Sequence, residues 1–406
     1  VPNGVAFVNT GHIEPNGRLS VDSMDYISRE CFDRLRSGKL VKGDIVYCLR
    51  GSTIGKTARV DLLEGSVASS LVIIRAKPKV SQEYLYYFLV SPLGQSFVRQ
   101  HENGSAQPNL SVSAISRYPI PLPPLAEQRA IAAVLGALDD KIELNRRMNA
   151  TLESMARALF QSWFVDFDPV RAKLDGPQAD QPAVLDPATA ALFPEHLVDS
   201  PLGHIPKGWE VSRLDEIGSV MMGLSPNGES YNADGIGIPL INGPVEVGDY
   251  FPVKTKWTEA ATRFAAKADL IFCVRGSTGR RVVSDGEYGI GRGVCAIRAK
   301  GGYHSFLYQT INVGLDRLLE KTTGSVFPSL SAPDIKGFSV LKPSKDILEA
   351  YERTTMPLIH RIQQNHHQSQ TLATLRDTLL PKLLSGELSV AAAAEQQNQV
   401  LPLEQG

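Results

Sequence analysis

Two stretches of this chain place basic side chains and hydroxyls directly after an apolar run. Residues 44–53 read DIVYCLRGST, and residues 269–278 read DLIFCVRGST. Glycine amides, short hydroxyls and cations suit hydrogen bonds to phosphate oxygens and to base edges. An ordinary solvated β-turn with structural ion pairs is the other interpretation. The candidate binding residues are Arg50, Ser52, Thr53, Lys56 and Arg59 in the first stretch, and Arg275, Ser277, Thr278, Arg280 and Arg281 in the second.

A second loop is also repeated. GSAQPNLS at residues 104–111 recurs as GSVFPSLS at residues 324–331. Its polar side chains are further candidates for binding, and the alternative is a turn that only leads into the last strand of its domain. The residues concerned are Asn103, Ser105, Gln107 and Ser325.

The sequence offers no arrangement of residues for catalysis. Residues 51–57 read GSTIGKT, with three residues between the glycines where a phosphate-binding loop needs four, and the second copy at 276–281 lacks the pattern. The cysteine and histidine spacings match no zinc site, and we expect His366 and His367 on a solvated helix face. No nucleophile with its base, and no pair of catalytic carboxylates, can be assembled. The sequence therefore predicts a binding protein that has no catalytic residue, no metal and no cofactor of its own.

The composition is that of a folded protein. Hydrophobic residues make up 43% of the 406 and charged residues 21%, which allows a packed core. No apolar run approaches the roughly 18–20 residues of a membrane span, and four cysteines without zinc spacing fit reduced thiols, so we expect a cytoplasmic protein. The net charge is −1, but residues 1–124 carry 14 basic against 10 acidic residues, and residues 200–343 carry 16 against 14. This distribution permits a nucleic-acid partner.

The repeated stretches must be positioned by two similar α+β domains of about 120–140 residues each. Short β-branched or aromatic runs predict strands at 44–49, 70–75, 269–274 and 293–298. Helical spacing predicts helices at 84–99 and 305–319. The second copy opens with GWEVSRLDEIG at 208–218, and the first copy lacks a counterpart. We therefore expect the first domain to be truncated by about 25–30 residues.

Each copy continues into a long helical stretch with apolar residues every seventh position. This period predicts a coiled-coil seam, and an asparagine in a seam fixes register and partner at a cost in stability. Pro357, and Gly136 with Ala137 in the first copy, predict kinks or breaks. A plain helical bundle without specific pairing is the alternative. The predicted seam residues are Leu138, Ile142, Asn145, Leu152 and Leu159 in the first copy, and Leu358, Ile362, Asn365, Leu372 and Leu379 in the second.

Several of these segments resemble one known family. Residues 119–170, which begin PIPLPPLAEQRAIAAVLGALDDKIELNRRMNATLES, resemble the central conserved region of type I restriction-modification specificity subunits. PLGHIPKGWEVSRLDEIG at 201–218 is similar to the entry of their second target-recognition domain, and TLATLRDTLLPKLLSGEL at 371–388 is similar to their C-terminal conserved region. The resemblance covers nearly all of residues 1–390.

The resemblance implies an α+β fold with two target-recognition domains separated by two long antiparallel coiled-coil spacer helices, related by a pseudo-two-fold axis. It divides the chain into recognition domain 1 (1–123), a central conserved helix (124–165), a connector (166–206), recognition domain 2 (207–343), a C-terminal conserved helix (344–388) and a tail that we expect to be disordered (389–406).

The implied function is sequence-specific binding of double-stranded DNA without catalysis. Each recognition domain would read one half of a bipartite asymmetric site, and the helices would set the gap and dock two modification subunits. S-adenosylmethionine, ATP and magnesium would belong to the modification and restriction subunits. Residues shared by the two copies should then hold phosphate or the turn. The differing cations, Lys56 and Arg59 in the first copy and Arg280 and Arg281 in the second, should contact bases. The alternatives are a coiled-coil protein scaffold without DNA readout and a stand-alone DNA methyltransferase.

Overall fold

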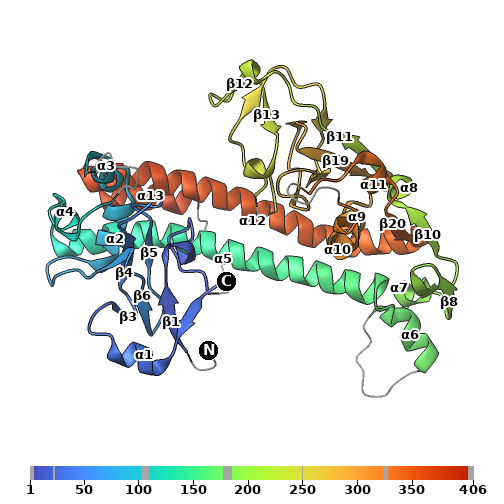
Figure 1. The fold of residues 1–406 in the computed structure, drawn as a ribbon, viewed down its shortest axis with the longest axis horizontal. Helices are drawn as coiled ribbons and strands as arrows, with labels where there is room; N and C mark the ends of the chain where they lie inside the picture. The colour runs from blue at the N-terminus through green and yellow to red at the C-terminus, as the bar shows by residue number, and fades with distance from the viewer. Residues whose placement is uncertain are drawn as a thin grey trace. The chain divides into compact units, whose positions relative to one another are not determined.

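Figure 1 shows the computed structural model of the chain, which describes residues 4–21, 23–101, 109–176, 185–248, 250–322 and 328–400. The chain divides into two compact units. Unit 1 comprises Val1–Arg146 and His366–Gly406, and unit 2 comprises Arg147–Asn365. Each unit combines small sheets, short helices and part of two long helices, as expected for a mixed helix and sheet fold.

The described part of unit 1 has two small sheets. Strands β2, β1, β6 and β3 form one sheet in that order, and β5, β4 and β7 form the other. Strands β1 and β6 are parallel, and all other neighbours are antiparallel. The strands are β1 (Val5–Val8), β2 (Asp25–Ile27), β3 (Lys39–Val41), β4 (Ile45–Cys48), β5 (Thr57–Arg59), β6 (Glu64–Val67) and β7 (Leu71–Ile74).

Three short helices of unit 1, α1, α2 and α4, begin after a serine that caps them. Ser28, Ser81 and Ser111 each accept a hydrogen bond from the backbone N–H three residues later, which satisfies an otherwise unpaired donor. Helix α2 is apolar along Tyr84–Leu89 and packs on β4 in the core of the unit. The shorter helices are η1 (Thr10–His12), α1 (Arg29–Arg34), α2 (Gln82–Val90), α3 (Pro92–His101), α4 (Val112–Ile115) and α13 (Val390–Val400).

Unit 2 has four sheets among its described residues, with the orders β11-β19-β16-β17, β12-β14-β13-β18-β15, β10-β20 and β8-β9. The strands are β8 (Leu197–Ser200), β9 (Gly203–Pro206), β10 (Glu210–Arg213), β11 (Gly218–Met222), β12 (Tyr231–Asn232), β13 (Ile238–Ile241), β14 (Trp257–Thr258), β15 (Phe264–Ala265), β16 (Leu270–Cys273), β17 (Arg281–Val283), β18 (Tyr288–Ile290), β19 (Val294–Ala299) and β20 (Ser339–Lys342).

The short helices of unit 2 contribute to its hydrophobic cores. Helix α9 packs on β16 and β19 in one core, and aromatic side chains of the long helices form another with Trp209. The helices are α6 (Asp168–Asp175), α7 (Pro187–Ala191), α8 (Leu214–Ile217), η2 (Gly228–Ser230), η3 (Pro244–Glu246), η4 (Lys300–Gly302), α9 (His304–Val313), α10 (Leu315–Leu319) and α11 (Ala332–Lys336).

The sequence repeat is also a repeat of strand pairing. Strand β4 is antiparallel to β5 and β7, as β16 is to β17 and β19. Strand β1 is parallel to β6, as β13 is to β18. The four predicted strands are confirmed to within one residue at each end. The two predicted helices are each divided, at Ser91–Pro92 and at Gly314, because the residue before a proline avoids helical geometry and glycine weakens a helix.

Two long helices, α5 (Leu125–Phe164) and α12 (Lys345–Ser385), pack antiparallel. In unit 1, Arg376 bonds Asp139 at 2.8 Å, and Asn145 bonds Gln368 at 2.8 Å. In unit 2, Asn365 donates to the Asn149 Oδ1 at 2.8 Å. As the residue number rises in one helix it falls in the other, which defines the antiparallel direction.

The predicted seam faces the interior of each unit. Both asparagines are nearly inaccessible, and each donates a hydrogen bond to the opposite helix. The buried members are Leu138, Asn145, Ile362, Asn365, Leu372 and Leu379, and the half-buried members are Ile142, Leu152, Leu159 and Leu358.

Two expectations about these segments are corrected. Neither long helix is broken, since α5 continues past Gly136 and α12 past Pro357. The tail is helical over Val390–Val400 rather than disordered. The reason is packing, because Ala393 is fully buried against the leucines at the end of α12, and such contacts stabilise a segment that composition alone does not order.

Candidate nucleic-acid interface

A buried aspartate fixes the start of each repeated strand. Asp44 accepts hydrogen bonds from the Arg75 guanidinium at 2.6 and 2.7 Å and from the Val41 N–H at 2.9 Å. Asp269 accepts the same bonds from Arg298, at 2.8 and 2.7 Å, and from the Ala266 N–H. The bond to Asp44 raises the pKa of Arg75, and the bond to Asp269 raises that of Arg298. Bidentate arginine–carboxylate pairs have defined geometry, so both copies have the same frame.

The turn after each strand exposes the shared cation and hydroxyl. Arg50 and Ser52 are exposed in the first copy, as Arg275 and Ser277 are in the second. The glycine after each arginine has a φ of +81° or +82°, a conformation that glycine adopts without strain. In the second copy a further hydrogen bond fixes the turn, because the Thr278 hydroxyl donates to the Pro328 carbonyl. These side chains are therefore presented to solvent by an ordered backbone.

The described end of the second predicted loop lies beside this turn. The Leu110 N–H donates to the Leu49 carbonyl at 2.8 Å, and the Leu330 N–H donates to the Val274 carbonyl at 3.1 Å. In each copy the described end of the second loop is thus bonded to the end of the repeated strand. The predicted residues Asn103, Ser105, Gln107 and Ser325 lie outside the described residues.

The cations that differ between the copies are mostly engaged inside their own units. Arg59 stacks on the Tyr86 ring at 4.8 Å and pairs with Asp139 at 3.7 Å. Arg281 is half-buried and bonds Asn312, and burial lowers its pKa. Each guanidinium thus already has a structural partner in its own unit, which disfavours the predicted base contacts of Arg59 and Arg281.

The other two differing cations stay at the surface. Arg280 is exposed but donates to two backbone carbonyls, at Pro244 and Val247. Lys56 is exposed and lines a cavity of unit 1. Of the predicted set of differing cations, Lys56 is therefore the one that the described contacts leave best placed to reach a ligand.

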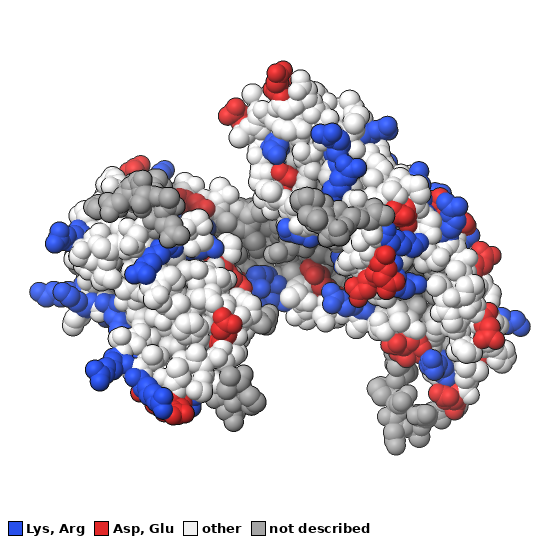
Figure 2. Space-filling view, viewed as in Figure 1, with Lys and Arg blue, Asp and Glu red and all other residues white. Residues whose placement is uncertain are grey.

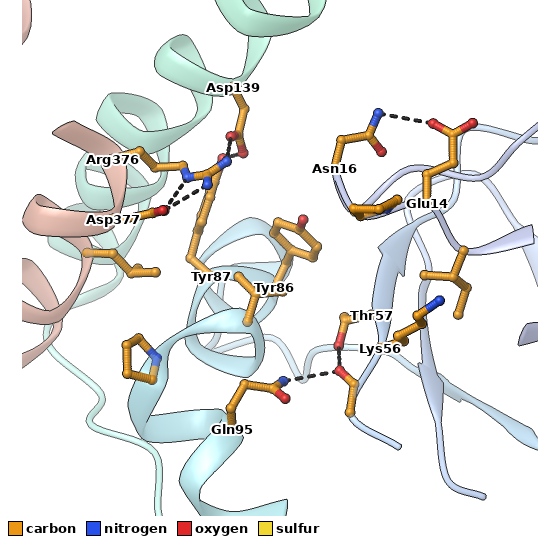
Figure 3. Close-up of a pocket in the computed structure, with 17 residues that line it drawn as sticks. Glu14, Asn16, Lys56, Thr57, Tyr86, Tyr87, Gln95, Asp139, Arg376 and Asp377 are labelled. Atoms are coloured by element: carbon orange, nitrogen blue, oxygen red, sulfur yellow. Dashed lines mark hydrogen bonds and ion pairs between the residues drawn. The ribbon is translucent and has the colours of Figure 1, made fainter. Parts of the chain in front are cut away.

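The cavity of unit 1 has a volume of about 500 Å³ and is shown in Figure 3. Arg376 lies between Asp139 and Asp377, and the Tyr87 hydroxyl donates to Asp139 at 2.7 Å. Lys56 and Thr57 approach from the strand side, and the Gln95 amide donates to the Gly55 carbonyl. Its charges are largely neutralised by one another, so the cavity is part of the packing of the domain on the long helices.

The loops of unit 2 include exposed residues that the sequence patterns did not identify. Arg292 is exposed in the turn after β18, and its N–H donates to the Ser225 hydroxyl at 2.9 Å. Arg275 lies against the same turn through its N–H, which donates to the Gly293 carbonyl. Lysine and arginine side chains gather over this part of unit 2 near β11 (Figure 2). The glycines at 289, 291 and 293 were the available signal, because close backbone approach requires them.

The described residues contain no group of three His, Cys, Asp or Glu side chains that could hold a metal. In the part of the chain that the structure describes, no helix is long and apolar enough to cross a membrane. Cys48, Cys273 and Cys295 are buried thiols, and burial raises the pKa of Cys273 to about 11. The site is thus a surface of loops, with cations and hydroxyls suited to phosphate and base edges.

Comparison with known proteins identifies the family. Two segments, residues 7–154 and 206–365, match the type I restriction modification DNA specificity domain. Each segment contains one copy of the Asp–Arg frame and its two loops. The chain therefore belongs to this family, which confirms the resemblance noted in the sequence.

Individual relatives agree with this assignment. The MjaIX specificity subunit of a type I restriction enzyme from Methanocaldococcus jannaschii is 27% identical over 326 residues, which cover 77% of this chain and 71% of that one. The HindI specificity subunit from Haemophilus influenzae is 24% identical over 442 residues, covering 95% of both. A type I restriction-modification S subunit from M. genitalium has a TM-score of 0.50 at 17% identity, covering 94% of this chain and 89% of that one, and shows a similar fold.

Proposed function

We propose that this chain is the DNA specificity subunit of a type I restriction-modification system and has no catalysis of its own. The observation that carries the proposal is the repeated frame: in each copy a buried aspartate, paired with an exposed arginine, begins the strand that leads to an exposed Arg–Gly–Ser turn. One copy would read each half of a bipartite asymmetric site. The family description and the names of the relatives support DNA as the ligand.

The partners follow from the same proposal. Two modification subunits and the restriction subunits would assemble on this chain and supply methylation and cleavage. We also propose the boundaries between the recognition domains, the conserved helices, the connector and the tail at residues 123, 165, 206, 343 and 388. Methylation mapping in a host that expresses this chain with its modification subunit tests it directly. Two half-sites with a fixed gap support it, whereas no methylation motif with all partners present would favour a scaffold without DNA readout.

The shared arginine gives a second test. Arg275→Ala should weaken binding to all duplexes alike and lower the slope of log affinity against log salt by about one, because one phosphate contact is lost. Arg213→Ala is the control, since Arg213 is exposed but pairs with Asp215 outside the candidate loops. A changed methylation motif at unchanged affinity would contradict the phosphate role.

We also propose that α5 and α12 form a coiled-coil spacer that relates the two recognition domains by a pseudo-two-fold axis. The buried Asn145 and Asn365, each bonded to the opposite helix, support this. Four residues inserted after Asn149 and four after Gln364 would lengthen both helices by about 6 Å. The gap in the recognised site should grow by one or two base pairs, and an unchanged gap would exclude a measuring role.

A further inference from the structure

Val245 is an aliphatic side chain that the fold holds out into solvent. It is 75% exposed, more than any other large apolar residue described in unit 2. Single exposed apolar residues are common and need no explanation. This one differs because it stands on an ordered turn, η3, and because that turn adjoins the candidate interface. A Cβ added at Gly276, the glycine of the exposed Arg–Gly–Ser turn, would lie 3.7 Å from Pro244.

Two charged side chains fix the η3 turn. Glu246 is 3% exposed, and its carboxylate accepts the N–H groups of Asn242 and Gly243 at 3.3 and 3.2 Å. From the other side, the Arg280 guanidinium donates to the carbonyls of Pro244 and Val247. The backbone on both sides of Val245 is therefore bonded, which fixes the turn that carries this side chain.

The first copy has the same turn with a different residue in its middle position, which we call the tip. Helix η1 follows β1 as η3 follows β13, and both strands pair in parallel with β6 and β18 respectively. His12 caps η1 by accepting the Asn9 N–H at 3.1 Å, the role that Glu246 has in η3. Gly11 then corresponds to Val245. The frame is shared and the tip differs, which is expected of a position that distinguishes two half-sites.

We infer that Val245 is a specificity-determining residue that contacts the 5-methyl group of a thymine in the half-site read by the second copy, with Arg280 as its positioning residue. The inference rests on the proposed function. In the major groove the thymine methyl is the apolar feature of the base edge, and aliphatic side chains recognise it. Arg280 lies where the first copy has Lys56, and its guanidinium supports the turn that carries Val245.

The experiment starts from the methylation motif mapped for the complete complex, so a failure to find any motif concerns the proposed function alone. Each thymine of the second half-site, in both strands, is then replaced singly by deoxyuridine, which removes the 5-methyl group. Binding is measured for the complex with its modification subunits. One position should bind about fourfold more weakly, the value for one buried methyl group. Val245→Ala should abolish that difference.

Matched variants distinguish the contribution of Val245 from general effects on DNA binding. Ile236→Ala removes an aliphatic side chain that is 53% exposed and lies before β13, at its other end, and it should keep the fourfold difference. Arg280→Ala should reduce the difference without changing affinity for the first half-site, and Arg280→Lys should restore it in part.

Three results would overturn the inference. The second half-site could contain no thymine in either strand, deoxyuridine could have no effect at any position, or Val245→Ala could keep the wild-type sensitivity to deoxyuridine. If Arg280→Ala fails to fold, the Val245→Ala result alone decides, because that side chain is exposed and its truncation leaves the turn bonded.

Discussion

Replacing Asp139 by alanine should destabilise unit 1 and leave unit 2 unchanged. Asp139 is 8% exposed and lies where helix α2 packs on α5 and α12. Its carboxylate accepts the Arg376 guanidinium at 2.8 Å and the Tyr87 hydroxyl at 2.7 Å, and it lies 3.7 Å from Arg59. The substitution leaves two half-buried arginines without this partner.

The size of the effect can be estimated from these contacts. A hydrogen bond to a charged group contributes about 1.5–3 kcal/mol, so two bonds give about 3–6 kcal/mol. The lower end applies because Arg376 keeps Asp377 at 2.7 Å, and because the adjoining cavity admits water to the freed groups. We expect a loss of about 3 kcal/mol, which corresponds to roughly a hundredfold larger open population of unit 1.

Hydrogen exchange measures each unit separately. The amides of β4 in unit 1 should exchange about a hundredfold faster in Asp139→Ala, and those of β16 in unit 2 should not change. Asp140→Ala is the matched control, because that neighbouring carboxylate is 73% exposed and pairs with Arg18 at 3.4 Å. Such surface pairs contribute about 0–1 kcal/mol. A loss below about 1 kcal/mol for Asp139→Ala, or equal acceleration in β4 and β16, would refute the reasoning.

Three further outcomes are expected. Asn365→Ala removes the bond to Asn149 and should lower the free energy of unfolding of unit 2 by about 1–2 kcal/mol in a denaturant titration; no change would mean that the pair is not stabilising. Burial raises the pKa of the Glu352 carboxyl above its ordinary 4.5, so protonation favours the folded state, and this stabilisation is lost as pH rises from 4.5 through the folded pKa. The stability of Glu352→Gln should therefore depend less on pH than that of the wild type, and identical pH profiles would contradict the burial effect. Iodoacetamide should label only the exposed Cys31 in the folded protein, which gives one adduct by mass spectrometry, and four adducts after denaturation. Labelling of a buried thiol in the folded protein would indicate local opening. The buried thiols are Cys48, Cys273 and Cys295.

Local patterns predicted the strands well and the helix limits less well. The runs at 44–49 and 269–274 are apolar throughout and form β4 and β16, which are buried on both faces. Residues 84–99 have helical spacing on both sides of Pro92, so the period alone could not show the division into α2 and α3. The helix at 390–400 was missed because its order depends on burial of Ala393 against distant leucines of α12.

The exposure of the candidate residues could be predicted in part. Arg50 and Arg275 are exposed as expected, because the turn that carries them is specified by the glycine that follows. Arg59 could not be distinguished from them in the sequence, since its partner Asp139 is 80 positions away. Val245 was not identified for a related reason, because an exposed valine has no local signature until the turn that presents it is seen.

The sequence by itself determined that this chain contains one unit twice, followed each time by a long helix with a seven-residue apolar period, and the resemblance of segments at 119–170, 201–218 and 371–388 indicated its family. Repeats, strand runs and helical periods are properties of neighbouring residues, and they can be recognised without a structure. Only the tertiary structure decided which cations remain free to meet a ligand. Burial and ion pairing join residues from different parts of the chain, as Arg59 joins Asp139 and Arg281 joins Asn312, and these contacts arise only when the whole unit is packed.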